Sequence, residues 1–170
     1  MSNNNNHKIG EAPWLHVLLS TGLGTGFIPI APGTAGALVA LVLWYLLFLN
    51  MSVSALTIVT SALIIITTVV GVWTSNIMER FWGKDPRTVN IDEFVGTWIP
   101  LLVAPCGENT WILALFGFAM FRVIDITKPL GCRVIDEQCS GGWGVILDDV
   151  LAGFYALLLT LCFKAILFIY

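Results

Sequence analysis

Charged side chains are scarce in this sequence: Asp, Glu, Lys and Arg make up 11% of its 170 residues, against about a quarter in soluble domains. Between Glu11 and Glu79 there is none. A stretch of that length can hold two helices of about 20 residues, enough to cross a bilayer. The sequence therefore predicts an all-α fold: an integral membrane helical bundle of about four membrane-embedded helices or helical hairpins, plus interfacial helices, forming one domain over residues 1–170.

Histidine is also scarce, and closely spaced cysteine pairs are missing. The two histidines are His7 and His16, and none of the four cysteines forms a Cys-x-x-Cys pair, so no zinc site is expected and the thiols are predicted to be free. The net charge of −3 and the scattered cations argue against a nucleic-acid partner. Residues 1–12, which include a run of asparagines, are expected to be disordered.

Glycine, by contrast, is concentrated in one stretch. Residues 21–36 contain five glycines, two prolines and three threonines, a composition that no plain membrane helix has. Glycine lets backbone N–H groups approach an anion closely, and threonine adds hydroxyl donors. Thr34 is predicted to cap a helix that begins at Ala35. Two interpretations stay open: a phosphate-binding loop, or a flexible turn for close helix packing.

Long apolar runs follow this stretch. Ala35–Leu49 and Val53–Trp73 predict a helical hairpin with Trp44, Tyr45 and Trp73 in the aromatic belts of the membrane. A polar segment covers residues 79–90. Prolines at 100 and 105 then divide the next apolar region into two pieces, each too short to cross a membrane alone. We expect a hairpin that crosses most of the layer and turns at residues 107–109.

Carboxylates recur at the starts of two apolar helices. Asp92–Glu93 and Asp148–Asp149 each precede apolar residues and a glycine at helical spacing. Arg122, Asp125 and Lys128 recur every three residues and so share one helix face, although this pattern alone also fits an interfacial anchor. The positive-inside rule places all these groups on the cytoplasmic side. Clustered carboxylates need a cation or raised pKa values, and an oxygen-only ligand set favours Mg²⁺.

Four blocks of this sequence together resemble the phosphatidylglycerophosphatase A family. They are Leu23–Gly26 with Ala31–Thr34, Ile91–Gly96, Phe121–Pro129 and Gly141–Gly153. The resemblance implies a Mg²⁺-dependent, multi-pass phosphatase of the bacterial inner membrane with its active site on the cytoplasmic face. It would remove the terminal phosphate of phosphatidylglycerophosphate to give phosphatidylglycerol, with this phospholipid and membrane lipids as its partners.

The needs of phosphoryl transfer suggest a role for each candidate residue. One or two Mg²⁺ ions are assigned to Asp92, Glu93, Asp148 and Asp149, of which Asp92 and Asp149 are also counted as catalytic. Lys128 and Arg122 would contact the phosphate, Lys128 as a catalytic group. Asp125 is either a further ligand or the nucleophile or base. The remaining substrate-binding candidates come from the glycine-rich stretch: Thr25, Gly26, Gly33 and Thr34.

Other functions fit the sequence less well. A Cys-x5-Arg thiol phosphatase is excluded because neither Cys132 nor Cys139 has an arginine six residues later, and no histidine is placed to serve as a nucleophile. A lipid transferase would need an Asp-Gly…Ala-Arg signature, which is absent. A small transporter or channel is the main alternative, since acids in membranes also mark ion pathways. A membrane scaffold would leave the acids without a purpose.

Overall fold

A computed structural model of the chain describes residues 12–84, 86–129, 131, 132, 135, 139 and 141–169. The expected disorder of residues 1–12 therefore concerns residues outside the described part, apart from Ala12. The described residues form helices and no strand, which confirms the all-α prediction. Four segments are long and apolar enough to cross a membrane: 32–50, 53–82, 107–127 and 142–167. All four cysteines are free, as expected.

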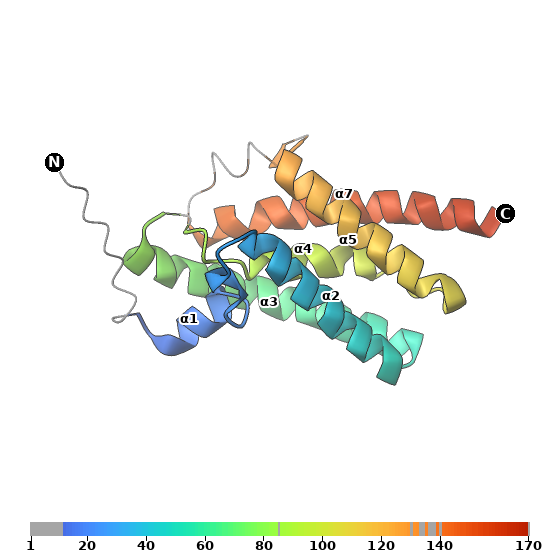
Figure 1. The fold of residues 1–170 in the computed structure, drawn as a ribbon, viewed down its shortest axis with the longest axis horizontal. Coiled ribbons are helices and arrows are strands. Elements are labelled where there is room, and N and C mark those ends of the chain that lie inside the picture. Colours follow the sequence, from blue (N-terminus) through green and yellow to red (C-terminus); the bar gives the residue numbers. More distant parts are fainter. Residues whose placement is uncertain are drawn as a thin grey trace.

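The first two long helices form the predicted hairpin (Figure 1). Helix α2 spans Pro32–Asn50 and helix α3 spans Val53–Trp82, where Ser52 caps α3 by accepting a hydrogen bond from the Ala55 N–H. The expected end of the second helix at Trp73 is wrong. No glycine or proline occurs between Trp73 and Gly83, whose φ of 86° ends α3, so part of the polar segment continues the helix.

The start of α2 also differs from the prediction. Thr34 does not cap a helix beginning at Ala35, because the helix already begins at Pro32, after Ala31 in the left-handed conformation (φ 51°). Proline suits this position, since the first turn leaves its N–H groups without intrahelical partners anyway. The missed boundary leaves the Thr34 hydroxyl on the first turn of α2, available to other side chains.

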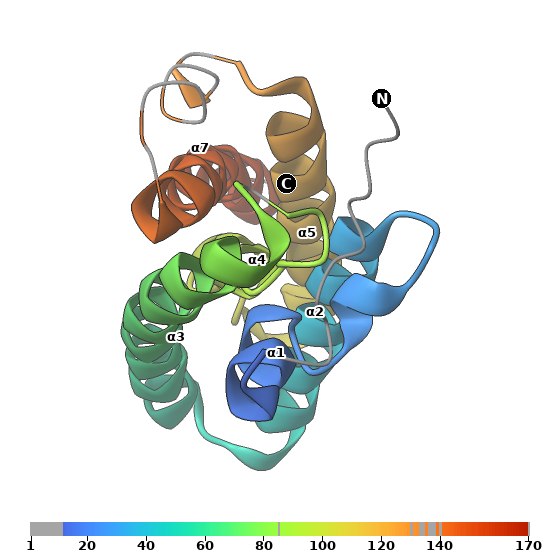
Figure 2. The same cartoon turned by 90° about the vertical axis from the view of Figure 1, so that its left-hand side faces the viewer.

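A short helix, α4 (Asp92–Leu101), occupies the centre of the bundle. It packs against α2, α3, α5 (Thr110–Thr127) and α7 (Gly142–Ile169), and residues 93–101 are all buried (Figure 2). The 3-10 turn Gly107–Asn109 then leads into α5, which confirms the predicted turn. The expectation that both arms of this hairpin are too short to span is wrong for the second arm, because the apolar face continues from the turn to Thr127.

Two glycines let α4 and α7 cross closely. A Cβ added to Gly96 would contact the Phe121 ring and lie 3.1 Å from the Asp149 carbonyl oxygen, and one added to Gly153 would lie 2.7 Å from the Gly96 carbonyl oxygen. Small residues allow this kind of close backbone approach between membrane helices. Asp92 and Asp149 each precede one of these glycines by four residues, so the crossing brings the two acid pairs to the same level.

Side chains at the other end of the bundle serve packing. Trp44 is buried and donates a hydrogen bond from Nε1 to Thr60 Oγ1 at 3.1 Å, so its assignment to an aromatic belt is wrong, while Tyr45 and Trp73 are exposed. The Lys164 ammonium donates to the carbonyl oxygens of Val103 and Pro105, at 2.9 and 3.2 Å. This cation satisfies backbone carbonyls that follow the end of α4.

Candidate active site

Two helices bring three carboxylates together at one end of the bundle. Asp125 comes from the last turns of α5, and Asp148 and Asp149 come from the second turn of α7. One carboxylate oxygen from each lies within 4.8 Å of those of the other two. Asp148 and Asp149 are buried and Asp125 is partly exposed. We call these three residues the carboxylate group.

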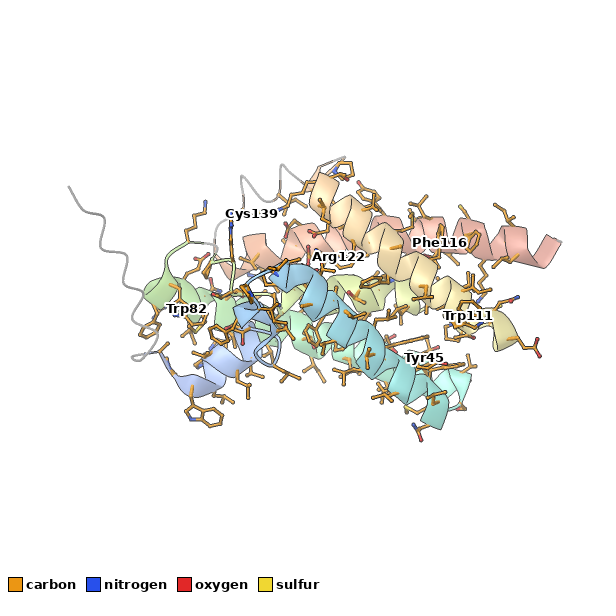
Figure 3. The ribbon with its side chains drawn as sticks, viewed as in Figure 1. Tyr45, Trp82, Trp111, Phe116, Arg122 and Cys139 are labelled. Atoms are coloured by element: carbon orange, nitrogen blue, oxygen red, sulfur yellow. The ribbon has the colours of Figure 1, made fainter. Side chains whose placement is uncertain are left out.

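Two cations border the carboxylate group. Arg122 forms ion pairs with Glu93 of α4 and with Asp125 at 3.0 Å, and its Nη2 donates to Thr34 Oγ1 at 3.4 Å. Figure 3 shows Arg122 extending from α5 near the start of α2. Lys128 pairs with Asp148 at 2.8 Å. The predicted convergence of the Arg122–Lys128 face with both acid pairs is therefore what the structure shows.

Lys128 has an unusual backbone conformation. It follows the last residue of α5 with φ of 44°, and its N–H donates to the Ile124 carbonyl oxygen at 2.8 Å. A non-glycine residue in the left-handed region carries a small conformational cost and is often found at functional sites. Here the conformation ends α5 while the Lys128 side chain reaches Asp148 on α7.

Asn90, for which the sequence predicts no role, holds the glycine-rich stretch against α4. Its Nδ2 donates to Thr25 Oγ1 at 2.9 Å and to the Pro32 carbonyl oxygen at 3.0 Å. A Cβ on Gly26 would collide with the Thr88 carbonyl oxygen, so this glycine permits the same close contact. The only sequence signal for Asn90 was its position just before an acid pair. Thr25 and Gly26 thus contact the segment leading into α4, whereas the start of α2 contacts Arg122.

The comparisons with known proteins agree with this geometry. The family model described as phosphatidylglycerophosphatase A matches residues 18–164, nearly the whole described bundle. The chain belongs to the phosphatidylglycerophosphatase A family. It is therefore a phosphoric monoester hydrolase.

Three relatives cover most of the chain. A Bacteroides thetaiotaomicron protein, provisionally named a phosphatidylinositol-3-phosphatase, is 47% identical over 86% of this chain and 91% of its own length. The phosphatidylglycerophosphatase A of Escherichia coli is 36% identical over 83% of this chain and 77% of its own. The Haemophilus influenzae phosphatidylglycerophosphatase A is 36% identical over 93% of both chains. No solved structure matches.

Electrostatics at the start of α4 reflect the crowding of acids. Burial raises the pKa of the Asp92 carboxyl well above its ordinary value, and the charges of Glu93, Asp148 and Asp125 add to the rise. Burial also raises the pKa of Glu93, to about 7, although the Arg122 guanidinium opposes this rise. A divalent cation among these groups would reverse the repulsion, because its charge favours the ionised carboxylates.

The carboxylate group fits a divalent cation. Asp149 Oδ2 is buried and accepts no hydrogen bond from any described residue, which is costly for a carboxylate unless a cation contacts it. Ligand oxygens of one Mg²⁺ lie at most about 4.2 Å apart, so carboxylate oxygens within 4.8 Å of one another need only small movements to bind the same ion. The three carboxylates supply only oxygen, the ligand atom that this ion prefers.

The structure divides the sequence-predicted metal ligands between two positions. Asp148 and Asp149 meet Asp125, which the sequence left open as a further ligand. Glu93 instead pairs with Arg122, and Asp92 Oδ1 accepts a hydrogen bond from the Glu93 N–H at 3.0 Å. The functional roles given to these residues stay predictions, as do those of Thr25, Gly26, Gly33 and Thr34.

Proposed function

We propose that this chain hydrolyses phosphatidylglycerophosphate to phosphatidylglycerol, as a Mg²⁺-dependent step of phospholipid biosynthesis in a bacterial inner membrane. The carrying observation is the carboxylate group bordered by Arg122 and Lys128, in a chain of the phosphatidylglycerophosphatase A family. Two relatives named for this activity cover most of the chain. The active site would face the cytoplasm, because Arg80, Arg87, Arg122 and Lys128 belong to segments at this end of the bundle.

Each charged residue has a task in this proposal. Asp125, Asp148 and Asp149 hold the divalent cation, which when bound supplies positive charge to the transferring phosphoryl group. Arg122 and Lys128 bind the phosphate and orient it, and the planar guanidinium of Arg122 suits two phosphate oxygens. Asp125 is the most exposed carboxylate of the three, so we assign it the proton that the water releases as it attacks phosphorus. As the P–O bond to the lipid breaks, Asp125 returns this proton to the leaving oxygen, which gives phosphatidylglycerol and phosphate.

Glu93 and Thr34 position Arg122 in this proposal. Because Arg122 is held from α4, α5 and α2 at once, its guanidinium is oriented before substrate arrives. Such preorganisation contributes to catalysis because no reorganisation is needed during the reaction. Asn90 acts one step further away, by fixing the segment that leads into α2.

A second phosphate-bearing lipid must be tested beside the first. The relative with 47% identity carries a name that specifies phosphatidylinositol 3-phosphate, also a phosphomonoester on a phospholipid headgroup. Purified protein in detergent should be given each lipid separately, with phosphatidate as a third, and phosphate release measured at several concentrations.

We expect the highest kcat/KM with phosphatidylglycerophosphate. A higher kcat/KM with phosphatidylinositol 3-phosphate would overturn the substrate assignment but retain the hydrolase. Release from none of the three, by folded protein with Mg²⁺ present, would favour the transporter or channel alternative. An Asp125→Asn variant that folds and keeps full activity would contradict the task given to Asp125.

A further inference from the structure

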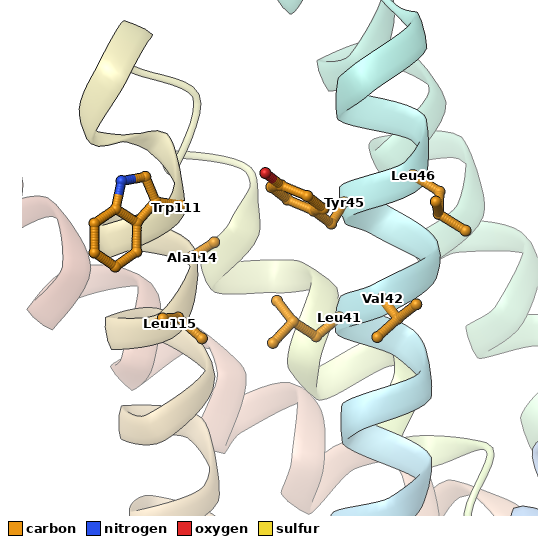
Figure 4. A pocket seen from close by; sticks show the side chains of 7 residues that line it. All are labelled: Leu41, Val42, Tyr45, Leu46, Trp111, Ala114 and Leu115. Carbon is orange, nitrogen blue, oxygen red and sulfur yellow. The ribbon is translucent and has the colours of Figure 1, made fainter.

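An apolar groove lies between α2 and α5, toward the end of the bundle opposite the carboxylate group (Figure 4). It has a volume of about 280 Å³ and is lined by apolar and aromatic side chains. Leu41 and Tyr45 extend from α2 toward α5, where Leu115 and Trp111 face them. Tyr45, Leu115 and Trp111 are exposed, so the groove opens to the membrane rather than into the core.

The groove lies on the same helix faces as the polar site. On α2, Leu41 follows Thr34 by seven residues, and on α5, Leu115 precedes Arg122 by seven. Residues seven apart share one face of a helix, and the distance along the axis is about 10 Å. Since Arg122 donates to Thr34 at 3.4 Å, the two helices meet at this contact and the groove lies two turns below it.

The depth of the groove matches hydrocarbon. Tyr45 and Trp111 are each eleven residues from the Thr34–Arg122 contact, or about 16 Å along the helices. Half of the hydrocarbon layer measures about 15 Å. The groove therefore extends to the middle of the membrane when the polar site lies at its surface. Leu38, exposed and four residues after Thr34, continues the apolar face between the two.

We propose that the groove binds one acyl chain of the phospholipid substrate while Arg122 and the carboxylate group hold its phosphate. This inference rests on the proposed function. Arg122 of the phosphate site, and Thr34 that it contacts, lie on the two helices that form the groove, so a lipid bound by its headgroup has a chain tethered beside the groove. Headgroup binding makes insertion of that chain an intramolecular event, whose effective concentration is set by the distance between the phosphate site and the groove. The groove thus selects substrates by chain length as well as by headgroup.

A matched pair of variants tests the groove by kinetics. Val42→Trp fills it from an exposed position, and Val69→Trp makes the same change at an exposed position on α3. Each is assayed with dioleoyl and with dibutanoyl phosphatidylglycerophosphate. We expect Val42→Trp to raise KM for the dioleoyl lipid between about threefold and tenfold. The effect should be this small because a chain that enters the groove replaces lipid contacts with protein contacts, so its binding gains only better van der Waals packing.

The dibutanoyl lipid is the internal control. Its chains are too short to reach the groove, so neither variant should change its kinetics, and Val69→Trp should leave both lipids unaffected. Equal effects of Val42→Trp on both lipids, or no effect on either, would overturn the proposal. Wild-type protein that hydrolyses neither lipid would instead refute the proposed phosphatase function.

A photolabelling experiment needs no turnover and so separates the two claims. The probe is a non-hydrolysable phosphonate analogue of phosphatidylglycerophosphate with a diazirine at mid-chain. We expect labelled peptides from residues 41–46 and 111–115, with labelling displaced by phosphatidylglycerophosphate but not by phosphatidylcholine.

Three other outcomes would overturn the assignment. Labelling that phosphatidylcholine displaces equally well would show ordinary membrane lipid in the groove. Labelling at Ile124, Tyr155 and Leu158, which line a second apolar groove between α5 and α7, would place the chain elsewhere. Absence of labelling together with a stable dimer closed over α2 and α5 would show that a second copy covers the groove.

Discussion

Gly33 gives the sharpest test of how the site is built. A Cβ added there would collide with Oε1 of Glu93 and lie 3.3 Å from Nη2 of Arg122. Gly33→Ala should therefore displace the Glu93 carboxylate from Arg122. Alanine is favoured over glycine within helices by about 1 kcal/mol, and the end of a glutamate side chain can move, so the fold should tolerate the change. Gly33→Ala should consequently lower phosphatase activity without lowering thermal stability.

The expected loss follows from the contact that is broken. A hydrogen bond to a charged group contributes about 1.5–3 kcal/mol, which corresponds to about 10- to 150-fold in kcat/KM. The assay is phosphate release from phosphatidylglycerophosphate in detergent, with thermal unfolding of the same preparation as the stability control. Gly33→Ala protein with wild-type activity, within about twofold, would refute the role of the Glu93–Arg122 contact.

A second substitution separates two explanations of that loss. Glu93→Asp withdraws the carboxylate by one methylene and leaves room for the new Cβ. If displacement of Glu93 causes the defect, a protein with both Gly33→Ala and Glu93→Asp should recover much of the activity that Gly33→Ala alone loses. The interaction free energy between the two substitutions should be about 0.5–3 kcal/mol. If phosphate instead requires close approach to the Gly33 backbone, Glu93→Asp should restore nothing.

Three further predictions concern other contacts. Lys128→Met removes the cation beside Asp148 and should lower kcat/KM by about 10²-fold in steady-state phosphate release; an unchanged value would exclude Lys128 from phosphate binding. Lys164→Met leaves two backbone carbonyls at the opposite end of the bundle without their hydrogen-bond donor, so it should lower the free energy of unfolding by about 1–3 kcal/mol. Its kcat/KM should change less than about twofold, and a catalytic defect in folded protein would contradict the structural role of Lys164. Asn90→Ala should lower both thermal stability and kcat/KM, the latter by about tenfold, because Thr25 and the Pro32 carbonyl lose the hydrogen bonds that the Asn90 amide donates. Activity at the wild-type level would show that this segment needs no such anchor.

Much of the bundle could be predicted because the membrane imposes simple rules on sequence. Uninterrupted apolar runs identified α2 and α3, and the turn at residues 107–109 was marked by Gly107 and its polar neighbours. The boundaries were less accurate, since a membrane helix can extend into a polar segment, as α3 does to Trp82. The central position of α4 could not be seen, because the mostly apolar segment that follows Asp92 and Glu93 looks the same at the core and at the surface.

The site was predictable in part for a related reason. Acid pairs and the Arg122–Asp125–Lys128 spacing showed which groups are expensive in a membrane and therefore converge. Which carboxylate meets which was not predictable, since it depends on the crossing of α4 and α7 at Gly96 and Gly153. Asn90 was missed because a single amide before an acid pair has no distinctive spacing.

The most direct test of the account is metal dependence measured together with a carboxylate variant. Phosphate release from phosphatidylglycerophosphate should require Mg²⁺, cease with excess EDTA and return when Mg²⁺ is restored. Asp149→Asn, at unchanged helical content, should need a much higher Mg²⁺ concentration or show no release. Full release in EDTA, or an Asp149→Asn variant with the wild-type Mg²⁺ requirement, would contradict the proposal that Asp125, Asp148 and Asp149 hold the ion on which hydrolysis depends.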